Sequence, residues 1–317
     1  MAPAPAVAGA QPVTWAPQAW GSAASARCGA GSGMLGFSTL IDTATLAANL
    51  DDPGWIFFDC RFDLTDTSAG RRAHLSGHIP GARYAHLDDD LSSPITATSG
   101  RHPLPAPEIL AHKLGQWGMN ASKQAVVYDE AGGAVAGRLW WLLRWLGHTQ
   151  VALLDGGLAK WQRERRAVST DAPAAVASVF QPHRDDNLWM NTAFVERAIE
   201  GDEQLLIDAR ANKRFRGEVE PLDKVAGHIP GSVNRPFQDN LDDAGCFLPV
   251  AELGAQLGAL LNDHSPSQVI STCGSGVTAC HNILAMEHVG LAGARLYAGS
   301  WSEWITDSSR PVAMGDE

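Results

Sequence analysis

Short apolar runs alternate along this chain with longer stretches in which apolar residues recur at helical spacing. Residues 125–128 and 268–271 are runs of mostly apolar residues beside polar ones, which is typical of buried strands. Residues 137–146 and 278–289 have the period of amphipathic helices. Strands that alternate with helices in this way favour parallel sheets with helical crossovers, so we expect an α/β fold.

One set of motifs occurs twice in the same order. The runs WIFFDCR and LLIDAR end in Asp-x-Arg, and each is followed by the pentapeptide GHIPG, which begins at Gly77 and at Gly227. LLDGGLAKW, from Leu153, then matches LYAGSWSEW, from Leu296. The paired motifs lie 143 to 150 residues apart, which indicates two copies of one domain.

Composition sets the expected domain boundaries. Residues 1–33 are rich in Ala, Pro, Gly and Ser and contain no acidic residue, so we expect a disordered extension, with the folded part starting at Met34. The polar, Ala- and Pro-rich segment 166–185 is the expected linker between domains 34–165 and 186–317. Because the extension lacks the basic start and apolar run of a secretory signal, a cytoplasmic location is expected.

Bulk composition limits the partners. The chain has 24 basic and 35 acidic residues, which gives a net charge of -11. A nucleic-acid partner is not expected, because the sequence contains no stripe of basic residues. No segment has the roughly 18 uncharged apolar residues of a membrane span. The five cysteines lack metal-ligand spacing and do not suggest a disulfide framework, so we expect free thiols and neither a metal nor an organic cofactor.

One cysteine stands in a loop suited to chemistry. The sequence CGSGVTA, which starts at Cys273, follows an expected strand and leads into an expected helix. Gly274 and Gly276 permit a loop whose backbone N–H groups surround an anion, and the helix start adds partial positive charge. The corresponding stretch of the first domain, 127–133, has no cysteine. Cys60, Cys246 and Cys280 are expected to be unreactive, and Cys28 lies in the extension.

These motifs resemble the tandem rhodanese family over residues 36–305. The resemblance implies two rhodanese-like domains, each a parallel sheet flanked by helices, of which only the second is catalytic and carries sulfur as a persulfide on Cys273. CGSGVTAC is similar to the active-site loop of 3-mercaptopyruvate sulfurtransferases, whereas thiosulfate-preferring members carry basic residues after the cysteine.

The resemblance also implies roles for other residues. It implies a proton relay of Ser275, His102 and Asp88, and it implies that Arg214 binds the substrate's carboxylate. The loop residues expected to bind substrate are Gly274, Gly276, Val277 and Thr278. From the residues alone, His102 is equally compatible with a capped turn beside Pro103, Asp88 with a solvated acidic run, and Arg214 with a surface charge. Leu222 stands where the family usually has a second arginine, and Lys224 is the nearby substitute.

The predicted function is transfer of sulfur from 3-mercaptopyruvate to a thiol or cyanide acceptor, with a thioredoxin-like reductant as a further partner. Two alternatives remain open: a thiosulfate sulfurtransferase of the same fold, and a non-catalytic rhodanese-like binding module. A phosphatase of related fold requires an arginine six residues after the cysteine, and Ala279 stands there.

Overall fold

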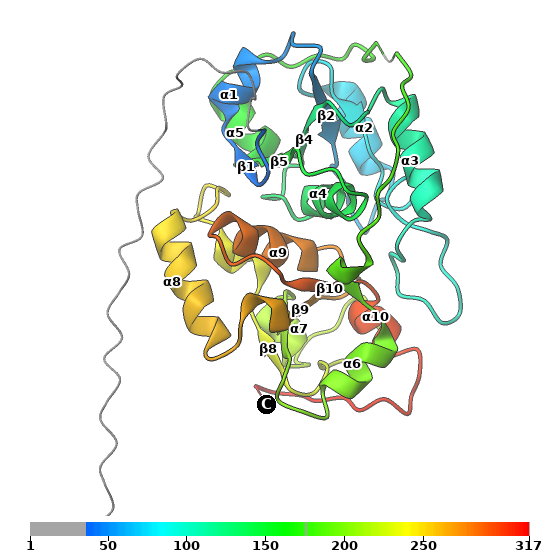
Figure 1. Ribbon diagram of the computed structural model, residues 1–317, viewed down its shortest axis with the longest axis vertical. Helices are drawn as coiled ribbons and strands as arrows, with labels where there is room; N and C mark the ends of the chain where they lie inside the picture. The colour runs from blue at the N-terminus through cyan, green and yellow to red at the C-terminus, as the bar shows by residue number, and fades with distance from the viewer. Residues whose placement is uncertain (1–35, 175, 317) are drawn as a thin grey trace, which may run out of the picture. The chain divides into compact units, whose positions relative to one another are not determined.

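The computed structural model describes residues 36–174 and 176–316 (Figure 1). The expectations about residues 1–33, about Cys28 and about Met34 as the start of the folded part lie outside these described residues. From Gly36 onward the chain forms one compact unit that contains both halves of the repeat.

The first half contains a five-stranded parallel sheet in the order β1-β5-β4-β2-β3. Apolar side chains fill its central strands because both faces of a parallel sheet are covered by helices. Its elements are β1 (Leu40–Ile41), α1 (Thr43–Ala48), β2 (Trp55–Asp59), α2 (Ala69–Ser76), β3 (Arg83–Tyr84), α3 (Pro107–Gln116), β4 (Gln124–Tyr128), α4 (Ala136–Trp145), β5 (Val151–Leu154) and α5 (Gly157–Arg163).

The second half repeats this sheet in the order β6-β10-β9-β7-β8. Its strands and α-helices are β6 (Trp189–Met190), α6 (Thr192–Ala198), β7 (Leu205–Asp208), α7 (Asn212–Phe215), β8 (Ser232–Asn234), α8 (Val250–Leu261), β9 (Val269–Thr272), α9 (Ala279–His288), β10 (Arg295–Tyr297) and α10 (Ser300–Trp304). Three 3₁₀ turns join them: η1 (Asp186–Leu188), η2 (Phe237–Asn240) and η3 (Pro266–Gln268). The predicted α/β class with two parallel sheets is confirmed.

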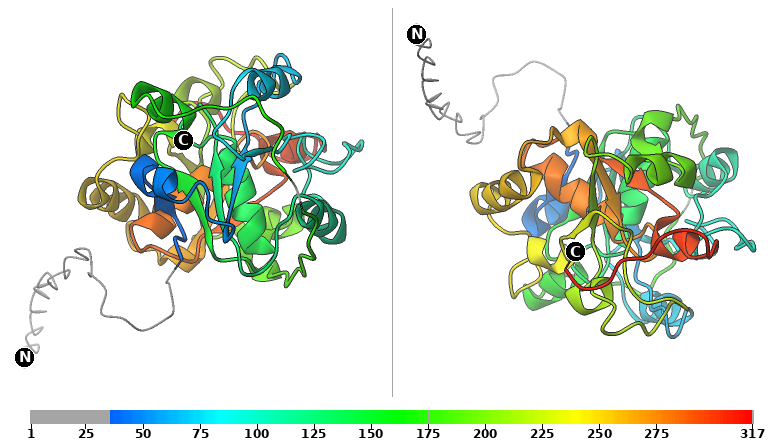
Figure 2. Two further views of the ribbon diagram at one scale, coloured as in Figure 1. Left: turned by 90° about the horizontal axis from the view of Figure 1, so that it is seen from above. Right: turned by 90° about the horizontal axis from the view of Figure 1, so that it is seen from below.

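Alternation along the strands divides the hydrophobic core into three layers. In β4, Ala125 and Val127 face a central cluster, whereas Val126 and Tyr128 face an outer cluster with α1 and α5. The second sheet has its own outer cluster around Trp301. The central cluster is shared by both halves and contains α4 and α9, which lie side by side in Figures 1 and 2. The two halves are therefore joined through a common core.

The repeated motifs have a shared structural role. In each Asp-x-Arg strand end the arginine pairs with the aspartate, at 2.6 Å in Arg61–Asp59 and 2.7 Å in Arg210–Asp208. Each arginine also donates from Nη2 to the carbonyl oxygen of the first glycine of GHIPG, at 2.8 Å in both halves. The strand end and the pentapeptide recur together because an ion pair connects them.

The observed element bounds differ slightly from the expected ones. Gln268, expected in a strand, belongs to a 3₁₀ turn, and β9 extends instead to Thr272. Helix α9 begins one residue late because Thr278 is its N-cap. Such differences arise because helix and strand ends depend on tertiary contacts that the sequence period does not report.

The described residues of 166–185 form no helix or strand, but they are held against the first half. Ser169 pairs with His78 in an isolated β-bridge, and the His183 N–H donates to the Leu146 carbonyl oxygen at 2.9 Å. Among the described helices, none has the length and apolar character needed to cross a membrane.

Candidate active site

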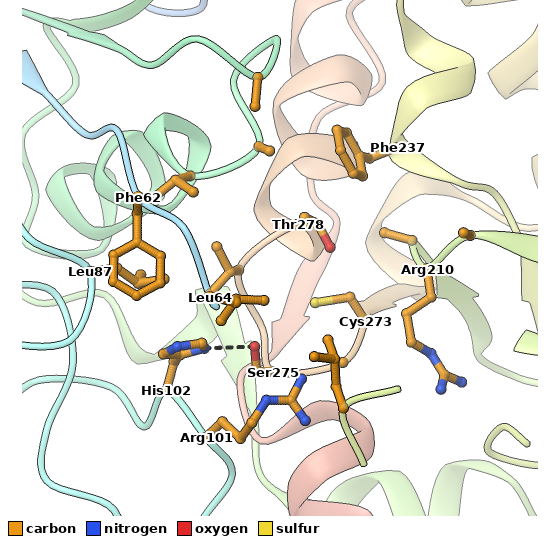
Figure 3. A pocket seen from close by; sticks show the side chains of 18 of the residues that line it. Phe62, Leu64, Leu87, Arg101, His102, Arg210, Phe237, Cys273, Ser275 and Thr278 are labelled. Atoms are coloured by element: carbon orange, nitrogen blue, oxygen red, sulfur yellow. Dashed lines mark hydrogen bonds between the residues drawn. The ribbon is translucent and has the colours of Figure 1, made fainter. Parts of the chain in front are cut away.

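A cavity of about 480 Å³ lies between the two halves, at the carboxyl ends of β4 and β9. Figure 3 shows Phe62, Leu64, Leu87 and His102 on the side of the first half, opposite Cys273 and Phe237 of the second. Ligand cavities commonly form where two domains meet at the carboxyl ends of parallel strands. Both halves therefore contribute to one site.

Cys273 is the thiol of this cavity. It follows the last residue of β9, and its side chain is buried at the cavity wall. The Gly276 N–H donates to its Sγ at 3.1 Å, which favours negative charge on the sulfur. The Cys273 N–H in turn donates to Ser300 Oγ at 3.0 Å, so the residue is held on both sides.

Two backbone positions around the loop are conformationally special. Gly276 has a φ of 75°, and a Cβ there would meet the carbonyl oxygen of Ala298 at 2.3 Å. Ser300 has a φ of 52°, a region that favours glycine, and its equivalent in the first half, Gly157, has 54°. A serine occupies this strained position, and its hydroxyl accepts the hydrogen bond that holds the Cys273 backbone.

His102, which belongs to the first half, contacts the cysteine loop of the second half. Its Nδ1 is 2.7 Å from Ser275 Oγ, the contact dashed in Figure 3, and its Nε2 is 3.2 Å from Asp88 Oδ1. His102 and Ser275 are buried, whereas the Asp88 side chain is 40% exposed and does not line the cavity. The three side chains form a chain of contacts from the cavity toward solvent.

The charge state of His102 follows from its surroundings. Burial, together with the positive charges of Arg138 and Arg101, lowers the pKa of His102 to about 3. Burial also raises the pKa of Asp88 above its usual value. A neutral imidazole has one donor and one acceptor nitrogen, so at neutral pH it can donate to one of its two partners and accept from the other.

Two guanidinium groups from different halves stand over Gly274. A Cβ on Gly274 would lie 2.9 Å from Arg101 Nη2 and 3.5 Å from Arg214 Nη1. Asp223 joins them, since one carboxylate oxygen contacts Arg101 Nη1 and the other lies 3.1 Å from Arg214 Nη2. Arg214 also pairs with Glu220 at 2.8 Å. Both arginines line the cavity whereas the two carboxylates do not, so the carboxylates hold the guanidinium groups toward it.

A third arginine, Arg138 of α4, is fully buried between the cysteine loop and the segment that contains His102. Its Nη1 donates to the Gly276 carbonyl oxygen and its Nη2 to the His102 carbonyl oxygen, both at 3.0 Å. It therefore connects the cysteine loop of the second half with the histidine segment of the first.

The first half has an equivalent loop in which a carboxylate takes the place of the thiol. Strand pairing aligns Asp129 with Cys273, because each follows the residue paired with the aspartate of the Asp-x-Arg motif. The Asp129 carboxylate accepts four backbone N–H groups at 2.8 to 2.9 Å, from Ala131, Gly133, Val135 and Ala136. This loop geometry therefore binds an anion in the half that lacks a cysteine.

The structure brings most of the residues expected from the sequence to this cavity. Cavity-lining members are Cys273, Gly274, Ser275, Val277, Thr278, His102 and Arg214. Gly276 lies behind the sulfur and Asp88 behind the histidine. Leu222 lines the cavity but Lys224 does not, so Lys224 does not replace the missing arginine.

Sequence reasoning missed Arg101, Arg138, Asp129 and Ser300. Arg101 directly precedes His102, and Asp129 aligns with Cys273 when the two halves are superposed by their strand ends, so a signal existed for both. The sequence contains no such signal for Arg138, because this residue lies within a helix whose apolar pattern resembles that of any core helix.

Comparisons with known proteins agree with the two-domain fold. The family of rhodanese-like domains matches residues 42–164 and 191–307. The "Probable 3-mercaptopyruvate sulfurtransferase" of Pseudomonas aeruginosa is 48% identical over 279 residues, which cover 87% of this chain and 98% of that protein. The thiosulfate sulfurtransferase of Bos taurus is 31% identical and covers 85% of this chain and 92% of its own length. The crystal structure of SseA from Escherichia coli, one of the 3-mercaptopyruvate sulfotransferases, superposes with a TM-score of 0.73 at 31% identity, covering 84% of this chain and all of that one (100%).

Proposed function

The chain belongs to the rhodanese-like family of sulfurtransferases, and we propose that it moves sulfur from 3-mercaptopyruvate to a thiol or cyanide acceptor through a persulfide on Cys273. The observation that carries this proposal is the Cys273 thiol, which accepts an N–H bond at the wall of a cavity that is also lined by His102 and Ser275, in contact with each other. A nucleophile and a proton relay then face the same space.

In the first step, the Cys273 thiolate attacks the sulfur of mercaptopyruvate. A sulfur–sulfur bond forms and the carbon–sulfur bond breaks, and its electron pair remains on carbon as the pyruvate enolate. The transferred sulfur keeps its own proton, so the products are a protonated persulfide and the pyruvate enolate. Together they carry the same total charge as the two reactants. The enolate then requires one proton to become pyruvate.

The Ser275–His102–Asp88 contacts support a source for that proton. Ser275 gives its hydroxyl proton to the enolate carbon, and the Nδ1–H of His102 reprotonates Ser275. Nε2 takes up a proton on the Asp88 side, where the carboxylate is 40% exposed to solvent. The imidazole thus changes tautomer without becoming a cation, in keeping with its lowered pKa of about 3.

The substrate's carboxylate binds to Arg214 together with Arg101. The Arg101–Asp223–Arg214 contacts support this role, because both guanidinium groups face the cavity beside Gly274. Arg101 Nη2 and Arg214 Nη1 are not used in the contacts with Asp223, so their N–H groups can bind a carboxylate. Gly274, Val277 and Thr278 line the same cavity as these arginines and the sulfur. Arg101 therefore supplies, from the first half, the positive charge that Leu222 does not.

In the second step, an acceptor thiolate or cyanide attacks the outer sulfur, the sulfur–sulfur bond breaks, and Cys273 leaves as a thiolate. We propose small thiols and a thioredoxin-like reductant as acceptors, and a cytoplasmic location, where free thiols persist. The net charge of -11 argues against a nucleic-acid partner.

Sulfur loading and donor preference together test the proposal. After treatment with mercaptopyruvate, intact-mass analysis is expected to find one added sulfur on Cys273, absent in Cys273→Ser and retained in the control Cys280→Ser. Ser275→Ala and His102→Ala are expected to lower kcat with mercaptopyruvate by roughly 100-fold or more but to affect thiosulfate little, because only the former donor leaves an enolate to protonate. A higher wild-type kcat/KM for thiosulfate, with equal losses for both donors in His102→Ala, would assign the chain to thiosulfate instead.

A further inference from the structure

Arg138 is a buried cation without a carboxylate partner. Its side chain is 0% exposed, and no described Asp or Glu lies within salt-bridge distance of it. Its Nε has no hydrogen-bond partner among the described residues, and its two other nitrogens donate to backbone carbonyl oxygens. A buried charge without an opposite charge is costly, so an anion beside Arg138 would be stabilised.

Other cations around Cys273 are already compensated. Arg210 forms a two-point pair with Asp208, at 2.7 to 3.1 Å. Arg101 and Arg214 share Asp223, and Arg214 also pairs with Glu220. None of these four carboxylate pairs involves Arg138, which therefore provides the uncompensated positive charge of the site.

The groups that face Arg138 leave one anion for it. His102 contributes only a carbonyl oxygen, and its imidazole is neutral because its pKa is about 3. The Cys280 thiol also lies beside the guanidinium, but burial raises its pKa to about 12, so it stays protonated at neutral pH. Cys273 is the other thiol close to it, because Gly276, whose carbonyl oxygen accepts from Arg138 at 3.0 Å, donates its N–H to Cys273 Sγ at 3.1 Å.

We propose that Arg138, supplied by the half without a catalytic cysteine, is the counter-ion of the anionic sulfur on Cys273. Gly276 connects the two groups, since its carbonyl oxygen accepts from Arg138 and its N–H donates to Sγ. The same guanidinium fixes the His102 segment, so charge and relay are positioned by one side chain. This inference rests on the proposed sulfur transfer, and it gives the first half an electrostatic role in the chemistry.

Two substitutions separate charge from hydrogen bonding. Arg138→Lys keeps the positive charge and loses the two-pronged donor, whereas Arg138→Gln keeps an N–H donor and loses the charge. The measurement is the rate at which iodoacetamide alkylates Cys273 as a function of pH, followed on the Cys273 peptide by mass spectrometry. Because an adjacent opposite charge shifts a titration by about one pH unit or more, the midpoint in Arg138→Gln is expected about one unit above wild type, with alkylation at pH 7 slowed roughly tenfold.

Arg138→Lys is expected to keep the wild-type midpoint, and so is the control Arg144→Gln. Arg144 lies on the same helix and pairs with Glu287 of the second half at 3.1 Å, so its loss tests the disruption of a contact between the halves. Equal midpoints in wild type and Arg138→Gln, or equal shifts in the Gln and Lys variants, would overturn the proposal in favour of a purely structural arginine.

If neither Arg138 variant folds, the counter-ion role can be tested on the wild-type protein by its thermal stability. Once the protonated persulfide on Cys273 has released its proton to solvent, its anion pairs with the buried cation, whereas alkylated Cys273 is neutral. The thermal midpoint of the sulfur-loaded protein is therefore expected above that of the alkylated protein, and equal midpoints would refute the counter-ion role. Failure of sulfur to load onto wild-type Cys273 would instead contradict the proposed function itself.

Discussion

Replacing Arg101 by glutamine tests the proposal that Arg101, together with Arg214, binds the substrate's carboxylate. Arg101 Nη2 lies over Gly274, next to the nucleophile, and Nη1 is tied to Asp223. The substitution removes one charge-assisted hydrogen bond to the substrate, which is worth about 1.5 to 3 kcal/mol. At 1.4 kcal/mol for each factor of ten, KM for mercaptopyruvate should rise roughly ten- to a hundred-fold.

The assay is steady-state pyruvate formation over a range of mercaptopyruvate concentrations. Little change in kcat is expected, because the carboxylate is held before and during the reaction to a similar extent. Leu222 lines the cavity and is 41% exposed, so Leu222→Arg has room for its longer side chain. Adding Leu222→Arg to Arg101→Gln should therefore restore most of the lost affinity.

The control is Arg184→Gln, which removes an exposed arginine that pairs with Asp186 at 2.8 Å and does not line the cavity. An unchanged KM in Arg101→Gln, or a fall in kcat alone, would refute the idea that Arg101 binds the carboxylate. A rise in KM that Leu222→Arg leaves uncorrected would instead mean that the two positions do not serve the same group.

Three further predictions concern the scaffold around the site. Asp129→Ala leaves two buried and two part-buried backbone N–H groups without their acceptor and should lower the free energy of unfolding by about 3 kcal/mol, measured by urea denaturation; a loss below about 1 kcal/mol would contradict its role as the anion of that loop. Burial lowers the pKa of His281 to about 4. Below about pH 6.5 this imidazole takes up a proton in the unfolded chain but stays neutral in the folded protein, so the free energy of unfolding should fall by roughly 3 kcal/mol between pH 6.5 and 4. His281→Asn should flatten this pH dependence, and an unchanged slope in the variant would be evidence against it. Ser300→Gly relieves the positive φ but removes the hydroxyl that holds the Cys273 backbone, so it should reduce kcat with both donors at little cost in thermal midpoint; equal kcat would show that the hydroxyl is dispensable.

The sequence by itself determined the features that depend on local spacing. The alternation of strands and helices, the duplicated Asp-x-Arg and GHIPG motifs and the glycines around Cys273 all follow from short stretches of chain, because periodicity and turn chemistry act over a few residues. The resemblance of these stretches to a known family then indicated which distant residues to consider.

Only the tertiary structure decided which of those residues meet. His102 and Ser275 are 173 positions apart, and their 2.7 Å contact exists because two separately patterned domains pack through α4 and α9. Arg138 looks like one more residue of a core helix until that packing places it between the cysteine loop and the histidine segment. Local patterns set which face of a helix is buried, but the partner that buries it, and hence the charge a buried arginine must balance, is fixed only when the two halves fold together.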